Sequence, residues 1–296
     1  MLRFLKHVQV AVWMTLEHDQ FSVAKAAAYS AIITLFPAVL LISSILTASH
    51  STLNFIREIS FAIGGIMPAG TAPAILTFFQ GHKPAPGRMI VTTSVITLWT
   101  GSGVMISWME GFRRAYQMPK IWNLTKERLI SFQLVFLAGI PMAFASFLLA
   151  FGNQIEHWVA FHTNHELDVY FLALWTVIRW LIALGTSVAV IVLIYHHGLP
   201  RTQPWHRVLP GSVLATVLWF ASTTVFGWYL RHYADYRVIY GSVGTAIALL
   251  IWLYIVSLVI LIGAEFNALR YPRYLFGSFS ELKVVATAEE RRPEGK

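Results

Sequence analysis

The side chain with the strongest chemical implication is Arg179, because it interrupts an otherwise uncharged run from Val169 to Tyr195. That run is long enough to cross a lipid bilayer as a helix. A guanidinium near the bilayer centre costs at least about 2.5–3.5 kcal/mol, so such a residue is expected to serve a function. We therefore predict that Arg179 binds an anionic group, and a lipid phosphate would match its paired N–H donors. The alternative is a structural arginine held by carbonyls or hydroxyls of neighbouring runs, such as those of Ser222 and Ser257.

A second candidate anion site is the sequence YGSVG, residues 240–244, which opens the last long apolar run. Ser242 is a residue type that caps helix N-termini. The flanking Gly241 and Gly244 would leave backbone N–H groups accessible at the positive end of the helix dipole. These three residues are candidate substrate contacts, although a simple tight turn explains the same sequence.

Carboxylates within the apolar runs occur only near the predicted ends, at Glu110 and Glu265. Either could pair with a loop arginine such as Arg207 or Arg270, and neither is deep enough to relay protons through a bilayer. The segment 152–168 contains three histidines and three acidic residues, but their spacing matches no standard metal motif. Phosphate-loop, serine-hydrolase and zinc-protease motifs do not occur. We therefore predict no catalytic residue, no metal site and no cofactor.

The composition indicates which elements position these residues. Only 12% of the 296 residues are charged and 56% are hydrophobic, whereas soluble domains contain about 25% charged residues. The chain has no cysteine, which excludes disulfides and thiolate chemistry. The predicted fold class is therefore an all-α polytopic membrane protein with six transmembrane helices. The predicted spans are Ala26–Ala48, Met89–Met109, Ile130–Phe151, Val169–Tyr195, Val208–Leu230 and Val243–Ala264.

The basic residues predict the topology. Sixteen of the 22 Lys and Arg residues lie in the terminal segments and in the second and fourth connections, and five lie in the other connections. The positive-inside rule then places both termini in the cytoplasm and Arg179 near the bilayer midplane. This bias also explains the net charge of +8, so we predict no nucleic-acid partner.

Three segments are expected to lie around the membrane domain, which we place at residues 26–270. Residues 1–25 mix apolar and basic side chains and predict a helix in the cytoplasmic interface. The first outer connection, 49–88, predicts amphipathic helices that could cap the spans, lie on the outer leaflet or dock an envelope protein. Residues 271–296 predict a largely disordered cytoplasmic tail.

Helix-breaking residues recur within the predicted spans. They are either sites of close helix packing or hinges around a central cavity. We group them with Glu265 as structural or gating residues. They are Pro37, Gly101, Gly103, Pro141, Pro210 and Gly211.

Several of these motifs resemble the YihY/BrkB family of bacterial inner-membrane proteins. The shared marks are LPG (209–211), YGS-x-G (240–244) and a WLY-containing helix that ends in GAE-x-NA (263–268). AKAAAYSAIITLFP (24–37) and WTGSGVMISWMEGFRRAYQMPK (99–120) are similar to that family's first two spans. The resemblance covers about residues 20–270. It implies six transmembrane helices and a bacterial inner-membrane location.

The resemblance implies less about activity. Members have been labelled ribonuclease BN or a serum-resistance virulence factor, and some have been connected with lipid or envelope transport. The leading hypothesis is that the chain is not an enzyme and transports or presents an anionic lipid or lipid-linked envelope precursor. The alternatives are a membrane scaffold that docks a partner and, more remotely, a membrane ribonuclease. The sequence does not indicate the oligomeric state.

Overall fold

The computed structural model describes residues 2–48, 87–162, 168–200, 202–232 and 236–270. These residues form seven α-helices and no strand, which confirms the all-α prediction. The helices are α1 (Leu2–Glu17), α2 (Gln20–Ala48), α5 (Gly87–Ala115), α6 (Leu124–His162), α7 (Asp168–His197), α8 (Trp205–His232) and α9 (Tyr236–Arg270).

Six of these helices are long and apolar enough to cross a membrane, which confirms the predicted number of spans. The candidate spans are Gln20–Ile42, Ile90–Ala115, Leu124–Phe144, Trp180–His197, Trp205–Leu230 and Gly244–Arg270. Most of the helices extend beyond the predicted runs because polar residues continue the helix at their ends. Arg179 lies within α7 (Asp168–His197).

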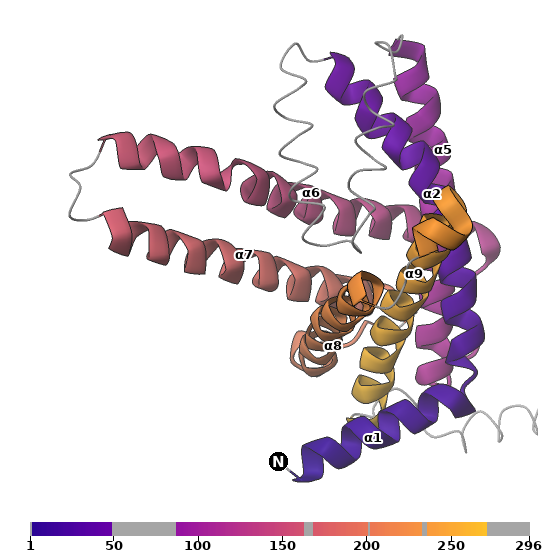
Figure 1. Cartoon of the computed structure of the whole chain (residues 1–296). Coiled ribbons are helices and arrows are strands. Elements are labelled where there is room, and N and C mark those ends of the chain that lie inside the picture. The colour runs from indigo at the N-terminus through magenta and orange to yellow at the C-terminus, as the bar shows by residue number, and fades with distance from the viewer. Residues whose placement is uncertain (1, 49–86, 163–167, 201, 233–235, 271–296) are drawn as a thin grey trace, which may run out of the picture.

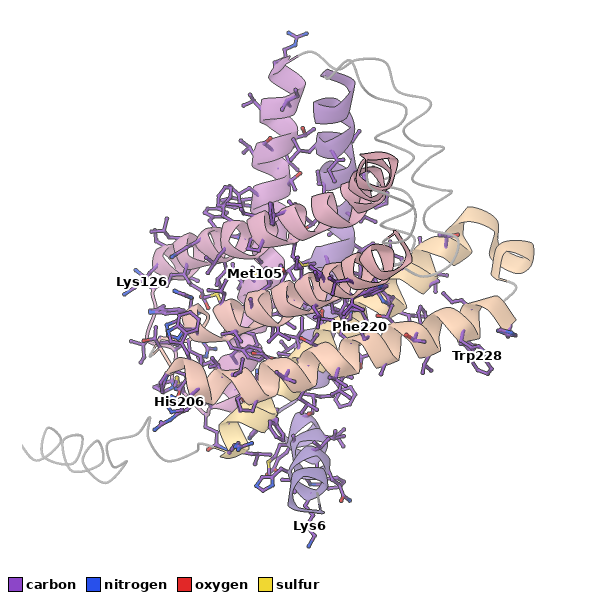
Figure 2. The ribbon with its side chains drawn as sticks, turned by 90° about the vertical axis from the view of Figure 1, so that its left-hand side faces the viewer. Lys6, Met105, Lys126, His206, Phe220 and Trp228 are labelled. Atoms are coloured by element: carbon purple, nitrogen blue, oxygen red, sulfur yellow. The ribbon has the colours of Figure 1, made fainter. Side chains whose placement is uncertain are left out.

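Five of the spans form two divergent hairpins and a central helix, α9, and the sixth, α8, packs against α9 (Figure 1). Helices α2 and α5 lie side by side, and α6 and α7 form a second antiparallel pair that points away from the first. Helix α9 contacts α1, α2, α5 and α8. In Figure 2, Lys126 of α6 and His206 of α8 lie on the same side of the molecule, whereas Trp228 lies at the other end of α8.

The described hydrophobic core lies mainly where the helices converge. It includes Val23 near the start of α2, Phe112 near the end of α5 and Leu261 near the end of α9. The up-and-down order of the spans puts the start of α2, the end of α5 and the start of α6 on one membrane side. By the loop charges, this is the side predicted to be cytoplasmic.

Helix α1 packs across this convergent end and is followed by a tight turn into α2. Ala11 of α1 is fully buried against Leu214 of α8 and Phe266 of α9. Asp19 adopts a positive φ of 52°, which aspartate tolerates better than most residues. Its carboxylate accepts a hydrogen bond from Ser22 in the first turn of α2. Of the predicted N-terminal segment 1–25, residues 2–17 form α1 and residues 20–25 belong to α2. Its position in the membrane interface remains a prediction.

The predicted helix breakers do not interrupt their helices. Pro37, Pro141 and Pro210 lie inside α2, α6 and α8 respectively. A Cβ atom on Gly101 would lie 3.3 Å from Thr34 of α2, and one on Gly103 would lie 3.2 Å from the Ser30 hydroxyl. These two glycines therefore permit close packing of α5 on α2.

Two predicted segments, 49–86 and the tail 271–296, lie outside the described residues. The amphipathic helices of the first outer connection and the disordered tail therefore remain predictions. The assignment of both termini to the cytoplasm is also a prediction, since it rests on loop charge alone.

Candidate functional site

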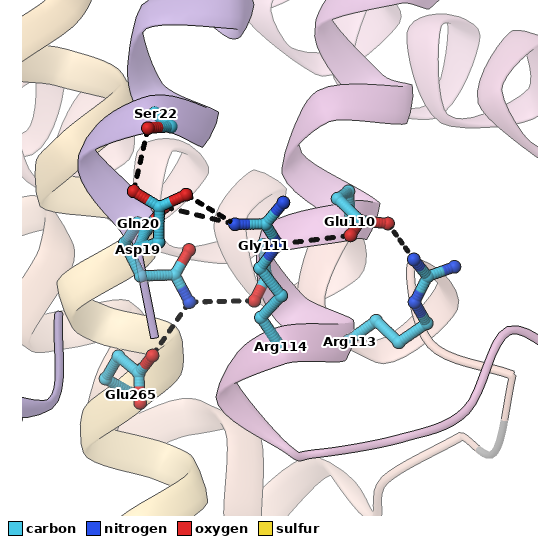
Figure 3. Close-up of polar contacts among 8 residues, drawn as sticks. All are labelled: Asp19, Gln20, Ser22, Glu110, Gly111, Arg113, Arg114 and Glu265. Atoms are coloured by element: carbon cyan, nitrogen blue, oxygen red, sulfur yellow. Dashed lines mark hydrogen bonds and ion pairs between the residues drawn. The ribbon is translucent and has the colours of Figure 1, made fainter. Parts of the chain in front are cut away.

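The most enclosed carboxylate in the described part of the chain is that of Glu265, which is only 1% exposed. It accepts a hydrogen bond of 2.7 Å from the side-chain amide of Gln20 and lies 2.9 Å from Nδ1 of His18. The same Gln20 amide donates to the Gly111 carbonyl at 2.9 Å. We call His18, Gln20, Gly111 and Glu265 the Glu265 centre, and Figure 3 shows three of its members.

This arrangement corrects the expected pairing of Glu265. Its partners are a histidine and a glutamine from the start of α2 and the preceding turn, rather than Arg207 or Arg270. Sequence reasoning missed both partners. A buried carboxylate must be hydrogen-bonded, but the sequence does not show which distant polar residue supplies the donor.

The Glu265 centre lies next to a close crossing of α8 and α9. A Cβ atom on Gly211 would lie 2.2 Å from the Gly263 carbonyl oxygen, and one on Gly263 would lie 2.6 Å from the Gly211 carbonyl oxygen. Asn267 accepts a hydrogen bond from the Gly211 N–H and donates one to the Val208 carbonyl. Asn267 thereby holds the turn of α8 around Pro210, where proline supplies no N–H.

The crossing gives a structural reason for two of the sequence marks. LPG (209–211) on α8 and GAE-x-NA (263–268) on α9 contact each other directly. Gly211, predicted as a structural or gating residue, therefore lies in a tightly packed contact, and Pro210 precedes it in α8.

A second polar region, on the other side of Gln20 and Gly111, is a cavity of about 480 Å³ between α2, α5 and α6. We call it the Arg128 cleft. Its walls combine apolar, hydroxyl and charged side chains. They are Ser22, Val23, Ala26, Ile106, Ser107, Glu110, Arg114, Lys120, Leu124, Glu127 and Arg128.

Most of the charged groups of the cleft are paired within the chain. Glu110 contacts both Arg113 and Arg114 of its own helix (Figure 3). Arg114 also reaches the carboxylate of Asp19 at 3.0 Å, and Lys120 lies 3.1 Å from Glu127. Hydrogen bonds from Ser22 and then from Arg114 lower the pKa of Asp19 below its ordinary value.

Arg128 differs from the other cations of the cleft. Its guanidinium donates a hydrogen bond of 2.6 Å to the buried hydroxyl of Ser102. Its central carbon lies 4.3 Å from the centre of the Trp99 ring, within the range of a cation–π contact. Among the described residues, no carboxylate lies within ion-pair distance of Arg128, so its charge is not balanced by a direct partner.

The structure does not test the predicted anion contact at Arg179. Arg179 lies in α7, but its side chain is outside the described residues. The neighbouring apolar side chains Val177 and Trp180 are exposed on the helix surface.

The predicted helix start at Ser242 is wrong. Helix α9 begins at Tyr236, so Gly241, Ser242 and Gly244 lie inside the helix. Their N–H groups are within the helical hydrogen-bond ladder, and Ser242 does not cap it. Gly244 is buried, while the side chain of Ser242 lies outside the described residues.

Within the described ranges, no group of three or more His, Cys, Asp or Glu residues is placed to hold a metal ion. The His- and Glu-containing segment 163–167 is outside those ranges. The chemistry available at the described sites is therefore hydrogen bonding and charge pairing.

The fold and these sites define a polytopic helical membrane protein with a charged cleft at one end of its spans. A family model with the description Virulence factor BrkB matches residues 13–277. The chain belongs to this family.

Curated relatives agree with this membership. A ribonuclease-like protein, YfkH of Bacillus subtilis (strain 168), is 28% identical over 187 residues, covering 63% of this chain and 67% of YfkH. A UPF0761 membrane protein of Tolumonas auensis is 32% identical over 158 residues, covering 51% of this chain and 49% of that protein. Another UPF0761 membrane protein, from Pseudoalteromonas atlantica, is 24% identical over 254 residues, covering 80% of this chain and 77% of that protein.

The match therefore spans about half the length of the Tolumonas auensis relative. No solved structure matches the chain.

Proposed function

We propose that the protein binds an anionic lipid in the bacterial inner membrane and transports or presents it, without catalysing a covalent reaction. The observation that carries this proposal is the Arg128 cleft, which combines cationic side chains and apolar walls at the ends of three candidate spans. A lipid headgroup at the membrane surface needs this combination, because its phosphate is charged while its acyl chains require apolar contacts.

The depth of Arg128 supports this placement. Arg128 is the fifth residue of the candidate span Leu124–Phe144, about 6 Å along the helix from Leu124. Trp99, against which it packs, is 58% exposed. An arginine this close to the end of a span is typical of the boundary between headgroups and hydrocarbon.

In this proposal, Arg179 is a second phosphate contact along the path of the lipid. Gly241, Ser242 and Gly244 are weaker candidates, because their location inside α9 removes the reason for an anion to bind their N–H groups. The sequence contains no nucleotide-binding motif, so we propose that lipid movement is downhill or driven by a partner protein.

The proposal is tested by identifying the lipids that remain bound to the full-length protein after purification in mild detergent. Quantitative mass spectrometry should show anionic lipids enriched over their fraction in the source membrane. Vesicles that contain the protein should then move a fluorescent anionic lipid between leaflets or to an acceptor. Bound lipids with the composition of the bulk membrane, together with no movement, would contradict the proposal.

A scaffold that docks a partner protein is the second candidate function. It is favoured by the apolar face that α1 leaves exposed, which includes Val12, Trp13 and Leu16. Such a face suits either a membrane surface or a partner protein. Cross-linking from position 13 in native membranes distinguishes the two, since a scaffold predicts one recurrent protein adduct and an interfacial helix predicts lipid adducts.

A further inference from the structure

We infer that the Arg128 cleft selects a lipid with a single phosphodiester charge, whose phosphate binds the Arg128 guanidinium beside Trp99 and Ser102. This inference rests on the proposed lipid-binding function and specifies the headgroup chemistry. It separates simple anionic phospholipids from lipid-linked precursors that carry a diphosphate.

The charge balance of the cleft supports the first part of this inference. Three cations, Arg114, Lys120 and Arg128, and two carboxylates, Glu110 and Glu127, line the cavity. Arg114 and Lys120 lie within 3.1 Å of these carboxylates, which leaves one positive charge without a direct partner. A phosphodiester carries one negative charge and would neutralise it.

The geometry of Arg128 makes it the phosphate ligand within the cleft. The Ser102 hydroxyl accepts a hydrogen bond from one N–H group of Arg128, and the Trp99 ring covers one face of the guanidinium plane. These two contacts fix the orientation of the side chain while other N–H donors remain for a ligand. An arginine fork held in this way binds two phosphate oxygens at once.

The remaining walls suit a phospholipid headgroup. The hydroxyls of Ser22 and Ser107 line the cavity and can donate to phosphate or accept from a glycerol group. The volume of about 480 Å³ lies within the range of about 300–1,000 Å³ that small-molecule sites occupy. Val23, Ala26 and Ile106 supply apolar wall for the lipid's glycerol backbone and first acyl carbons.

A second phosphate group would meet repulsion in the same cavity. Glu127 is buried, and its carboxylate is therefore only weakly screened by water. Glu110 lies on the facing helix α5 and lines the same space. The second phosphate of a diphosphate would lie near carboxylates that are already paired. It would find no further unpaired cationic side chain in the cleft lining.

The experiment is a competition for the full-length protein in detergent, measured by native mass spectrometry. The ligands are phosphatidylglycerol, a polyprenyl diphosphate and inorganic phosphate. Phosphatidylglycerol is expected to bind best. Stronger binding of the diphosphate would overturn the single-charge assignment, and equal binding of inorganic phosphate would overturn the assignment to a lipid. Both outcomes use the unaltered protein and do not depend on a variant that folds.

The residue assignment is tested with Arg128→Gln and the matched control Lys126→Gln. Lys126 is exposed on the same helix and does not line the cleft (Figure 2). Loss of a charge-assisted bidentate contact should weaken phosphatidylglycerol binding about tenfold in Arg128→Gln and leave Lys126→Gln unchanged. Equal effects of the two variants would overturn the role of Arg128 even if anionic lipids remain enriched, which leaves the proposed function standing.

Discussion

The Glu265 centre and the Arg128 cleft lie beside each other and are built from consecutive residues. Asp19 and Gln20 are consecutive residues where the turn enters α2. Asp19 contacts Arg114, which lines the cleft, whereas Gln20 binds Glu265. On α5, Glu110 lines the cleft, and the carbonyl of the next residue, Gly111, accepts a hydrogen bond from Gln20 (Figure 3). Neighbouring side chains on one helix point in different directions, so the same two helices serve both regions.

The two regions differ in how their charge is compensated. Glu265 is buried, and its hydrogen-bond partners are the uncharged amide of Gln20 and the imidazole of His18. Glu110 is partly exposed and pairs with two arginines beside a cavity. The closed region therefore joins α2, α5 and α9 near the end of α1, while the open region is the one that we propose binds an anion.

The largest expected effect is on the closed region. Glu265→Leu removes an acceptor from the buried Gln20 amide, which keeps only its bond to the Gly111 carbonyl, and from the half-buried His18. Loss of these contacts should cost about 1–3 kcal/mol in total. The apparent melting temperature in detergent should fall by several degrees. Glu265→Gln retains an acceptor oxygen, so its melting temperature should fall less. Equal melting temperatures for Glu265→Leu and the parent protein would contradict the structural role of this carboxylate.

A smaller loss of stability is expected at the α8–α9 crossing. Gly263→Ala places a methyl group against the Gly211 carbonyl and the Tyr195 hydroxyl, and overpacking of this kind costs about 1–3 kcal/mol. Gly139→Ala is the matched control, because nothing lies within 4 Å of its Cβ position. Thermal unfolding should give a clearly lower melting temperature for Gly263→Ala and an unchanged one for Gly139→Ala. If both variants melted alike, the close approach would not limit stability.

Glu110→Gln is expected to change ligand preference with little change in stability. It removes one negative charge from the cleft wall and frees Arg113 and Arg114 from their shared carboxylate. The net charge of the cleft then becomes more positive. Binding of a polyprenyl diphosphate should therefore rise severalfold relative to binding of phosphatidylglycerol. An unchanged ratio in the native mass spectrum would show that cleft charge does not set the preference.

The smallest effect is expected for Asp19→Asn, because its ion pair with Arg114 is exposed to solvent. The pKa of Asp19 is lowered by Ser22 and then by Arg114. The stabilising contribution is therefore present above the ordinary aspartate pKa and is lost as the pH falls through the lower folded-state pKa. Melting curves of Asp19→Asn and the parent should nearly coincide at neutral pH. A large difference there would contradict the exposed character of this pair.

The sequence predicts the helical class and the number of spans well, since apolar runs of about 20 residues have few alternatives to crossing a membrane. It also predicts close packing at Gly101 and Gly103 as one of two possibilities. It does not predict that the hairpins diverge or that LPG contacts GAE-x-NA, because these depend on how helix surfaces match over long sequence distances. The helix start expected at Ser242 is wrong, since α9 already begins at Tyr236.

The candidate site was harder to predict than the fold. Arg179 stands out in the sequence because an arginine in an apolar run is costly, and its function remains a proposal. In the sequence, Arg128 is one of the basic residues that predict the topology. A topology-setting arginine and a ligand-binding arginine look alike in sequence. The contacts of Arg128 with Ser102 and Trp99 distinguish them, and these contacts bring together residues 26 and 29 positions apart.

The most direct test of the central claim is the amount of phosphatidylglycerol bound per molecule in Arg128→Gln and Lys126→Gln, with the melting temperature of each variant measured in the same detergent. We predict that Arg128→Gln retains the parent melting temperature and loses about nine-tenths of the bound lipid at subsaturating concentration, in line with a tenfold weaker affinity. We predict no loss for Lys126→Gln. Full lipid occupancy in a folded Arg128→Gln protein would contradict the claim that the Arg128 cleft binds the headgroup.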